Sequence, residues 1–300
     1  MFEKLERVEK LPISRFQREF IGKKPIVFTE RTGNWRPEEF LTQKNLLTYA
    51  GKTMVKVRPK RDGYLAATRI TQYMTLDEYN RQLTKWYLDI NLGLITEDLY
   101  PPYLHDTPIL KNCPHLAKHL SGFPVGYLPN WYHSCWQKFC LFFIGPSKGT
   151  TPLHFDSCET NNLFFQVSGK KKFILIPNDE RLKPYRINWQ WSTLNAQAPN
   201  DQEARLLQSI GTKEVILQSR DILYMPPRTW HQVSMIEPGI SFNIDWHTSQ
   251  SAIKSLLSLF RKSPVRNAFN YNLPLTLGLT FGVPAVLLIP WIEKHLDYVD

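Results

Sequence analysis

The sequence predicts a mainly β protein whose core is an antiparallel sandwich or barrel, with a mixed α/β region before it and helices after it. Short apolar runs separated by turns fill residues 131–248, helical and strand patterns mix in residues 1–130, and an apolar helical segment occupies residues 249–300. A chain of 300 residues can bury one good core with helical additions, but not several independent domains. We therefore expect the N-terminal region to pack on the core as an elaboration.

Six apolar runs define the predicted core strands. They are short, they are broken by turns such as Gly145-Pro146 and Ser168-Gly169, and we expect no helices between them. This texture favours antiparallel pairing. The runs are residues 139–144, 163–167, 173–176, 215–217, 222–224 and 240–244.

A long polar insertion, residues 178–213, interrupts these runs and carries Trp189 and Trp191. Long insertions between core strands are often lids or binding loops, although an ordinary surface excursion is the simpler interpretation. The two tryptophans favour a substrate-facing role. Trp131 and Trp136 are further candidates for the wall of a substrate groove, with the buried core as the alternative place for such residues.

Three local signals define elements in the N-terminal region. Residues 13–21 have helical spacing and end at Gly22, a natural helix stop. Residues 25–28 form a short apolar run typical of a buried strand. Thr75 and Glu78 have the spacing of a capping box, which predicts the start of another helix.

The chain carries a formal net charge of +10, which favours nucleic acid, anionic lipid or acidic protein as partners and says nothing about the fold. Its densest basic run alternates with the apolar residues 54, 55 and 57. We interpret this run as a solvated edge strand whose cations block aggregation, and an RNA-binding groove is the alternative. The basic residues are Lys52, Lys56, Arg58, Lys60 and Arg61.

The C-terminal region contains a stretch, residues 273–292, without any charged residue. At roughly 20 residues it has the length of a membrane span. Pro274, Pro284 and Pro290 would break or kink a single helix repeatedly. We therefore predict two short helices buried against the barrel or against a second subunit, which would make a homodimer, and membrane association is the alternative.

The cysteines and the N-terminus predict the compartment. Cys113, Cys135, Cys140 and Cys158 are too few and too irregularly spaced for a disulfide framework or a zinc site. The first residues contain no apolar run of the secretory type. We expect a cytoplasmic, reducing compartment, and the apolar C-terminal stretch leaves peripheral membrane attachment open.

A candidate metal site starts at His154 and Asp156. Residues two apart in a strand project from the same face, so the imidazole and the carboxylate can reach one ion. His231, after the prolines that end the preceding strand, supplies a third ligand from elsewhere in the chain. Two histidines and one carboxylate on one face of an octahedral ion leave positions open, which is the pattern of non-haem Fe(II) oxygenases.

His-x-Asp alone is weak evidence, because it arises by chance and a lone histidine in a strand is more often packed or exposed. The surroundings make the pattern specific. A strand at residues 162–167 follows it, then a turn at Gly169 and a second strand at residues 171–177. The later histidine is framed by a strand, a proline stop and an aromatic residue.

Over most of residues 15–247 the chain resembles the JmjC-domain and factor-inhibiting-HIF-like hydroxylases, which are cupin-like 2-oxoglutarate oxygenases. It resembles the small stand-alone hydroxylases of that family rather than the large chromatin demethylases. The matching motifs are Lys24-Pro25-Ile26-Val27-Phe28 with Trp35, Tyr103-Leu-x-Asp-x-Pro108, Thr151-Pro-x-His-x-Asp156, Asn162-x-Phe-Phe-x-x-x-Gly-x-Lys171, Asp221-x-Leu-Tyr-x-Pro226 and Trp230-His231.

This resemblance implies a double-stranded β-helix, the jelly-roll or cupin core, in which 2-oxoglutarate chelates Fe(II) and O2 is the co-substrate. Matched onto this chain, Lys171 and Thr151 would hold the distal carboxylate of 2-oxoglutarate, and Asn162 would line the same pocket. A buried carboxylate requires such a charged and hydrogen-bonding partner. Lys170 and Lys172 should face the opposite side and be solvated.

The last core strand departs from the pattern of the family, because Asp245 stands where related hydroxylases often have asparagine. Either Asp245 alters the hydrogen bonding near the cosubstrate, or Asn243 takes the role of the usual asparagine. The family's tyrosine to the distal carboxylate is not located by the motif match, and Tyr127 and Tyr132 are the candidates.

The function implied by the resemblance is oxidative decarboxylation of 2-oxoglutarate to succinate and CO2, coupled to hydroxylation of a C–H bond on a protein or peptide side chain. An RNA-base or small-molecule hydroxylase is one alternative, and the basic charge would suit RNA. A metal-binding cupin module without redox turnover is another. Thr151, Asn162 and Lys171 argue against that module, because it has no need of a 2-oxoglutarate clamp.

Overall fold

The computed structural model describes most of the chain. The described residues are 2–29, 35–59, 64–65, 71–96, 99, 101–120, 122–187, 190–257 and 268–296.

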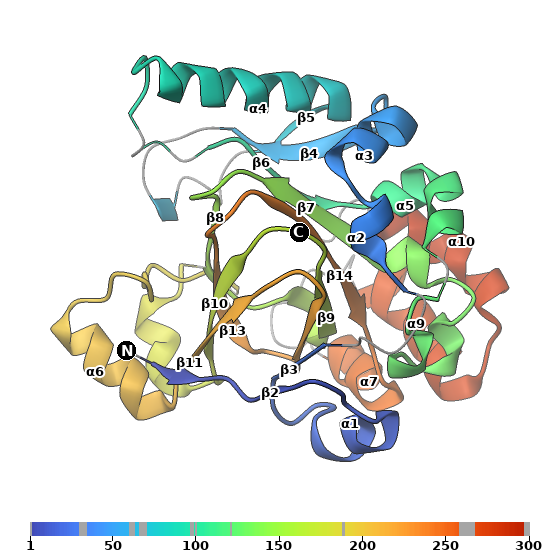
Figure 1. Ribbon diagram of the computed structural model, residues 1–300. Coiled ribbons are helices and arrows are strands. Elements are labelled where there is room, and N and C mark those ends of the chain that lie inside the picture. The colour runs from blue at the N-terminus through green and yellow to red at the C-terminus, as the bar shows by residue number, and fades with distance from the viewer. Residues whose placement is uncertain are drawn as a thin grey trace.

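Two β-sheets face each other and curve around a common interior (Figure 1). The smaller sheet has the order β1 (Glu3–Lys4), β11 (Lys213–Leu217), β10 (Lys171–Ile176), β13 (Trp230–Met235) and β8 (Thr150–His154). The larger sheet has the order β2 (Arg7–Val8), β3 (Ile26–Thr29), β12 (Asp221–Met225), β9 (Asn161–Gln166), β14 (Gly239–Trp246), β7 (Cys140–Gly145), β6 (Tyr103–Thr107), β4 (Met54–Arg58) and β5 (Gln72–Thr75).

The eight strands β7 to β14 form the core, four in each sheet. Their order is β12-β9-β14-β7 in the larger sheet and β11-β10-β13-β8 in the smaller one, and every pairing among them is antiparallel. The chain therefore passes back and forth between two antiparallel sheets, as a double-stranded β-helix requires. The predicted fold class is confirmed.

Strands from the N-terminal region extend the larger sheet on both sides of this core. β3 pairs with β12 at one edge, and β6 pairs with β7 at the other. The prediction of a solvated edge strand at residues 52–61 is wrong where the structure describes it. β4 lies between β5 and β6, so Lys56 and Arg58 are only 7% and 9% exposed. Lys52 is exposed, whereas Lys60 and Arg61 lie outside the described residues.

Helices cover the outside of the sheets. In Figure 1, α4 runs across the top over β4 and β5, α1 lies below β2, and the C-terminal helices flank the right side. The described α-helices of the N-terminal region are α1 (Ile13–Glu19), α2 (Pro37–Phe40), α3 (Gln43–Ala50), α4 (Leu76–Asn91) and α5 (Ile109–Asn112). The capping box is confirmed, because the Glu78 N–H donates to Thr75 Oγ1 at 3.2 Å and the Thr75 N–H donates to Glu78 Oε2 at 2.7 Å.

Aromatic side chains fill the space between the core strands and the helices. Phe16 on α1 contacts Tyr224 edge to face, with ring centroids 4.9 Å apart. Phe165 and Phe242 stack at 4.8 Å inside the larger sheet. Each of these rings is at most 2% exposed, and burying one stabilises the fold by about 2 kcal/mol. This packing supports the larger sheet from the side that faces the helices.

The insertion lies between β10 and β11. It contains α6 (Asp201–Ile210), a helix that the expectation of a helix-free core region did not include. A capping box at Asn200 and Glu203 starts this helix, and Gly211 at φ 81° ends it. An isolated bridge from Trp191 to His154 ties the insertion to the end of β8. Trp189 lies outside the described residues.

The C-terminal region folds as α7 (Ser249–Leu257), a π-helical turn (Ala268–Asn272), α9 (Leu273–Phe281) and α10 (Ala285–Leu296). The break between α9 and α10 confirms the prediction of two short helices. One face of this pair is buried through residues such as Leu275 and Ile292, and Phe281 is 72% exposed on the other side. No helix in the described part of the chain is both long enough and apolar enough to cross a membrane.

Candidate metal centre and its cavity

Two neighbouring strands of the smaller sheet bring the three predicted metal ligands together. β8 ends at His154, and Asp156 follows two residues later. β13 pairs with β8 in antiparallel register, which places His231 directly opposite His154. The two imidazole rings lie 4.2 Å apart between centroids. The pairing of β8 with β13 therefore brings the three ligands together, which the sequence spacing could predict but not show.

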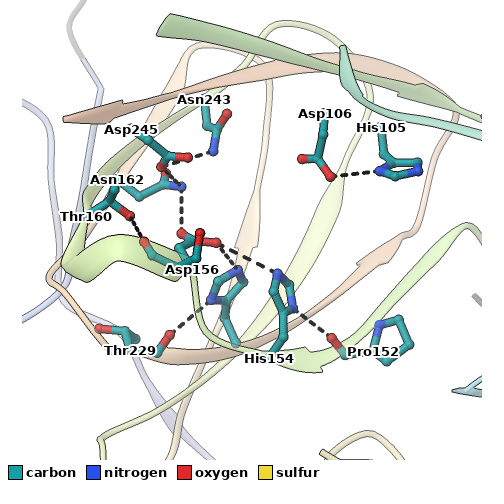
Figure 2. A network of polar contacts seen from close by, with 12 residues as sticks. His105, Asp106, Pro152, His154, Asp156, Thr160, Asn162, Thr229, Asn243 and Asp245 are labelled. Carbon is teal, nitrogen blue, oxygen red and sulfur yellow. Dashed lines mark hydrogen bonds and ion pairs between the residues drawn. The ribbon is translucent and has the colours of Figure 1, made fainter. Parts of the chain in front are cut away.

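The ligand atoms of the three side chains converge on a common centre, and Figure 2 labels His154 and Asp156 of this group. Asp156 Oδ1 is 3.8 Å from His154 Nε2 and 3.7 Å from His231 Nε2. All three ligand atoms lie within 4.8 Å of one another, and no other group of three such residues does so among those that the structure describes. This spacing and this donor set fit one divalent ion.

Backbone carbonyls fix the orientation of both imidazoles. His154 Nδ1 lies 2.8 Å from the Pro152 carbonyl, and His231 Nδ1 lies 3.0 Å from the Thr229 carbonyl. Because a carbonyl only accepts, Nδ1 carries the proton in each ring and Nε2 keeps its lone pair for an ion. Burial, and then the electrostatic effect of the neighbouring His231 imidazole, lower the pKa of His154 well below its ordinary value, so the His154 ring is neutral.

A bridge of side chains supports the carboxylate ligand. Asn162 Nδ2 lies 2.9 Å from both Asp156 Oδ2 and Asp245 Oδ1 (Figure 2). Asn243 Nδ2 lies 3.4 Å from the same Asp245 oxygen. Burial, and then the charge of Asp156, raise the pKa of Asp245 well above its ordinary value. Asn162 thus reaches the metal ligand itself, whereas the sequence placed it only in the cosubstrate pocket.

One cavity of about 420 Å³ contains the triad and the residues predicted to bind the cosubstrate. Lys171 lines it and is completely buried. Its ammonium lies 2.7 Å from Ser241 Oγ and 3.1 Å from the Tyr103 hydroxyl. Burial lowers the pKa of Lys171 to about 7. Thr151, Asn243 and the other predicted residues line the same cavity.

Tyr103 is the tyrosine beside Lys171, and neither of the two candidates from the sequence is. The Tyr127 hydroxyl donates to the Leu11 carbonyl at 2.6 Å, and the Tyr132 hydroxyl accepts from the His247 N–H at 3.0 Å. Both rings are part of the core, outside the cavity lining. Tyr103 begins the Tyr-Leu-x-Asp-x-Pro motif, so the signal was present, but the pairing of β6 with β7 was needed to place it.

Lys170, just before β10, and Lys172 on β10 flank Lys171 and are more exposed than it, as predicted. Lys170 pairs with Glu237, and Lys172 Nζ lies 3.0 Å from Glu214 Oε2. Their side chains are 41% and 35% exposed, against a Lys171 that solvent does not reach. The alternation of a strand therefore separates one buried cation from two partly solvated ones.

Trp191 brings the insertion into the site. Its ring stacks on the His154 imidazole at 4.6 Å and 21°, and the Arg58 guanidinium carbon lies 5.7 Å from the centre of the indole. Trp191 and Arg58 both line the cavity. Trp136 instead stacks on Phe123 in the core, and Trp131 donates to the Val283 carbonyl at 3.0 Å. Of the tryptophans considered, only Trp191 is described as part of the cavity wall.

A family model described as a cupin-like domain matches residues 13–252. The chain is 23% identical over 263 residues to "2-oxoglutarate and iron-dependent oxygenase JMJD4" of Gallus gallus, covering 81% of this chain and 59% of that protein. It is 32% identical over 108 residues to "Jumonji C domain-containing protein 5" of Drosophila melanogaster, covering 35% of this chain and 26% of the relative. It is 27% identical over 117 residues to "Lysine-specific demethylase JMJ30" of Arabidopsis thaliana, covering 38% and 27%. The matches thus span between about a quarter and three fifths of the relatives' own length.

Proposed function

The chain belongs to the family of cupin-like domains, and we propose that it is an Fe(II)- and 2-oxoglutarate-dependent oxygenase that hydroxylates a C–H bond on a protein or peptide side chain. The observation that carries the proposal is the placement of the triad and of Lys171 in one cavity. A relative that aligns with 81% of this chain is named as an oxygenase dependent on 2-oxoglutarate and iron.

His154, Asp156 and His231 would hold the iron. Two imidazole nitrogens and one carboxylate are the donor set that Fe(II) takes in this class of enzyme, and three protein ligands leave coordination positions open. When bound, iron supplies the oxidising chemistry that converts 2-oxoglutarate and O2 to succinate and CO2 while the substrate is hydroxylated. The carbonyls of Pro152 and Thr229 keep both rings turned toward the ion before it arrives.

Lys171 would bind the distal carboxylate of 2-oxoglutarate. A fully buried ammonium is costly unless an anion neutralises it, and the carboxylate supplies that anion. The hydroxyls of Tyr103 and Thr151 line the same cavity and would satisfy remaining lone pairs of the carboxylate, while Ser241 Oγ lies 2.7 Å from the ammonium and helps to hold it. Burial keeps the Tyr103 hydroxyl protonated by raising its pKa, so this group can donate.

Aromatic side chains keep water away from both ends of this arrangement. The rings of Phe143 and Phe164 lie 5.0 Å from the Lys171 ammonium, and Trp191 covers one face of His154. Electrostatic interactions are stronger where water is excluded, so the same side chains strengthen the binding of the carboxylate. A docking module without redox turnover would have no use for this buried clamp.

The direct test is coupled turnover. Protein supplied with Fe(II), 2-oxoglutarate and O2 should release succinate and CO2, and a candidate peptide should increase the rate. His154→Ala should lower the rate at least 100-fold, because it removes a metal ligand. The exposed His115 lies outside the cavity, so His115→Ala is the matched control and should retain the rate. No succinate from the unmodified protein with any substrate, or an unchanged rate in His154→Ala, would refute the proposal.

An RNA-base hydroxylase is the second candidate, and the net charge of +10 is the observation that favours it. If the protein binds single-stranded RNA with an affinity that falls steeply with salt, and if RNA stimulates succinate release, then RNA replaces the peptide as the proposed substrate. Binding of RNA without stimulated turnover would leave the peptide proposal in place.

A further inference from the structure

A carboxylate that belongs neither to the triad nor to the cosubstrate clamp lines the same cavity. Asp106 lies on β6 where the pairing with β7 shifts register between Leu104 and Thr107. Its φ is 45°, a left-handed conformation that is costly for a residue with a side chain. Bulges and strained residues of this kind often serve to aim a side chain at a functional site.

His105 holds one oxygen of this carboxylate. Its Nδ1 lies 2.7 Å from Asp106 Oδ2. Burial lowers the pKa of His105 to about 4, so the ring is neutral and this nitrogen carries its only proton. Although burial opposes ionisation of Asp106, the hydrogen bond from His105 and the charges of Arg58 and Lys56 hold the pKa of the carboxyl well below its usual value. Asp106 is therefore an anion in the cavity wall.

The second oxygen is available to a ligand. Within the part of the chain that the structure describes, no donor is recorded for Asp106 Oδ1, and a third (33%) of the side chain is exposed while His105 beneath it is only 4% exposed. Figure 2 shows the carboxylate apart from His154 and Asp156, and all three residues line the same cavity. An ionised carboxylate with free lone pairs binds N–H donors strongly and repels other carboxylates.

From this arrangement, and resting on the proposed function, we propose that Asp106 is the residue that selects the substrate, by accepting hydrogen bonds from a nitrogen-bearing side chain. The shared chemistry is an N–H donor group, which a carboxamide, an ammonium or a guanidinium can supply. His105 is the positioning residue for this interaction, because it fixes the carboxylate without using its second oxygen. Arg58 lines the same cavity, and its positive charge repels a fully charged substrate cation. Among the three N–H donor groups we therefore expect the carboxamide to be preferred.

The test uses short blocked peptides that differ only at a central residue. Glutamine and glutamate form one isosteric pair, asparagine and aspartate a second, lysine and arginine supply the cations, and methionine is the apolar control. We expect coupled succinate release with at least one N–H donor to exceed that with the carboxylate peptides at least tenfold. Asp106→Asn should lower the coupled rate at least tenfold and leave the KM for 2-oxoglutarate within twofold. Asp201→Asn, on the exposed start of α6, is the matched control and should match the unmodified protein.

A binding measurement separates this proposal from the proposed function. Calorimetry with the Zn(II)-loaded protein and 2-oxoglutarate reports peptide affinity without turnover, and Asp106→Asn should weaken the best peptide about tenfold. Asp106→Gly is the second variant, because glycine removes the carboxylate and accepts a positive φ without strain. Peptide binding that depends on Asp106, without any conversion of 2-oxoglutarate, would refute the proposed function and support the role of Asp106 in substrate binding. A carboxylate peptide used as well as every N–H donor peptide, an unchanged Asp106→Asn, or no binding of any peptide while 2-oxoglutarate is still decarboxylated would overturn the site and leave the proposed function in place.

Discussion

The triad and the clamp around Lys171 share a cavity but are assembled in different ways. The triad comes from the paired strands β8 and β13 of one sheet, and backbone carbonyls orient its imidazoles. The clamp combines β10 and β8 of the smaller sheet with β6 and β14 of the larger one, and hydroxyl groups contact its ammonium. The first site therefore depends on one strand register, whereas the second depends on how the two sheets face each other.

The largest effect expected from this comparison is in metal binding. His231→Ala removes one of the three ligands, so the affinity for Fe(II), or for Co(II) as a substitute, should fall at least 100-fold. The fold should persist, because the core around β13 is unchanged on its other face. Metal content after dialysis measures the loss. Retention of one equivalent of tightly bound metal would show that the three residues do not share an ion.

Lys171→Met should have the complementary effect. Metal affinity should stay within about threefold, and the affinity for 2-oxoglutarate should fall roughly 100-fold, since truncating one partner of a buried charge pair costs 2–5 kcal/mol. The variant should also unfold at a higher temperature without cosubstrate, because an apolar side chain replaces a buried cation. A loss of metal together with cosubstrate would mean that the two ends of the cavity are one cooperative unit.

A smaller effect is expected from single hydroxyls of the clamp. Tyr103→Phe removes one donor to a charged group, worth about 1.5–3 kcal/mol, so the KM for 2-oxoglutarate should rise roughly tenfold or more. Tyr127→Phe is the matched control, because its hydroxyl bonds to the Leu11 carbonyl in the core. The control should lower the free energy of unfolding by about 1 kcal/mol and leave KM unchanged. A larger rise of the KM for 2-oxoglutarate in Tyr127→Phe than in Tyr103→Phe would show that Tyr127, and not Tyr103, contacts the cosubstrate.

The remaining expected effect is on stability rather than on ligand affinity, and it depends on pH. Lys171 has a pKa of about 7 in the folded, ligand-free protein and an ordinary value near 10.5 when unfolded. Between these values the unfolded chain binds more protons, so the free energy of unfolding should rise as the pH increases from about 7 toward 10. Lys171→Met should lack this contribution, and saturating 2-oxoglutarate should reduce it by restoring the charged form. Thermal unfolding curves at several pH values measure it. The same slope in protein and variant would contradict the burial of a neutral lysine.

The same comparison explains what the sequence could predict. His154, Asp156 and His231 were found because short-range spacing and a proline-framed strand are visible in the sequence. Lys171 was assigned from the family resemblance, and strand alternation distinguished it from its neighbours. Tyr103 and Ser241 were not identified, since their positions depend on pairings between segments far apart in the chain. Lys56 and Arg58 were assigned to a solvated edge for the same reason: only the strand order shows that β4 lies inside the sheet.

The stack of Trp191 on His154 has a practical consequence. An indole held 4.6 Å from an imidazole that ligates a paramagnetic ion should lose much of its emission when that ion binds, so tryptophan fluorescence becomes an internal titration signal. Eight other tryptophans contribute background, and Trp191→Phe identifies the share that belongs to this ring. Loading with Fe(II) or Co(II) could then be followed in real time, without a substrate and before the reaction is known.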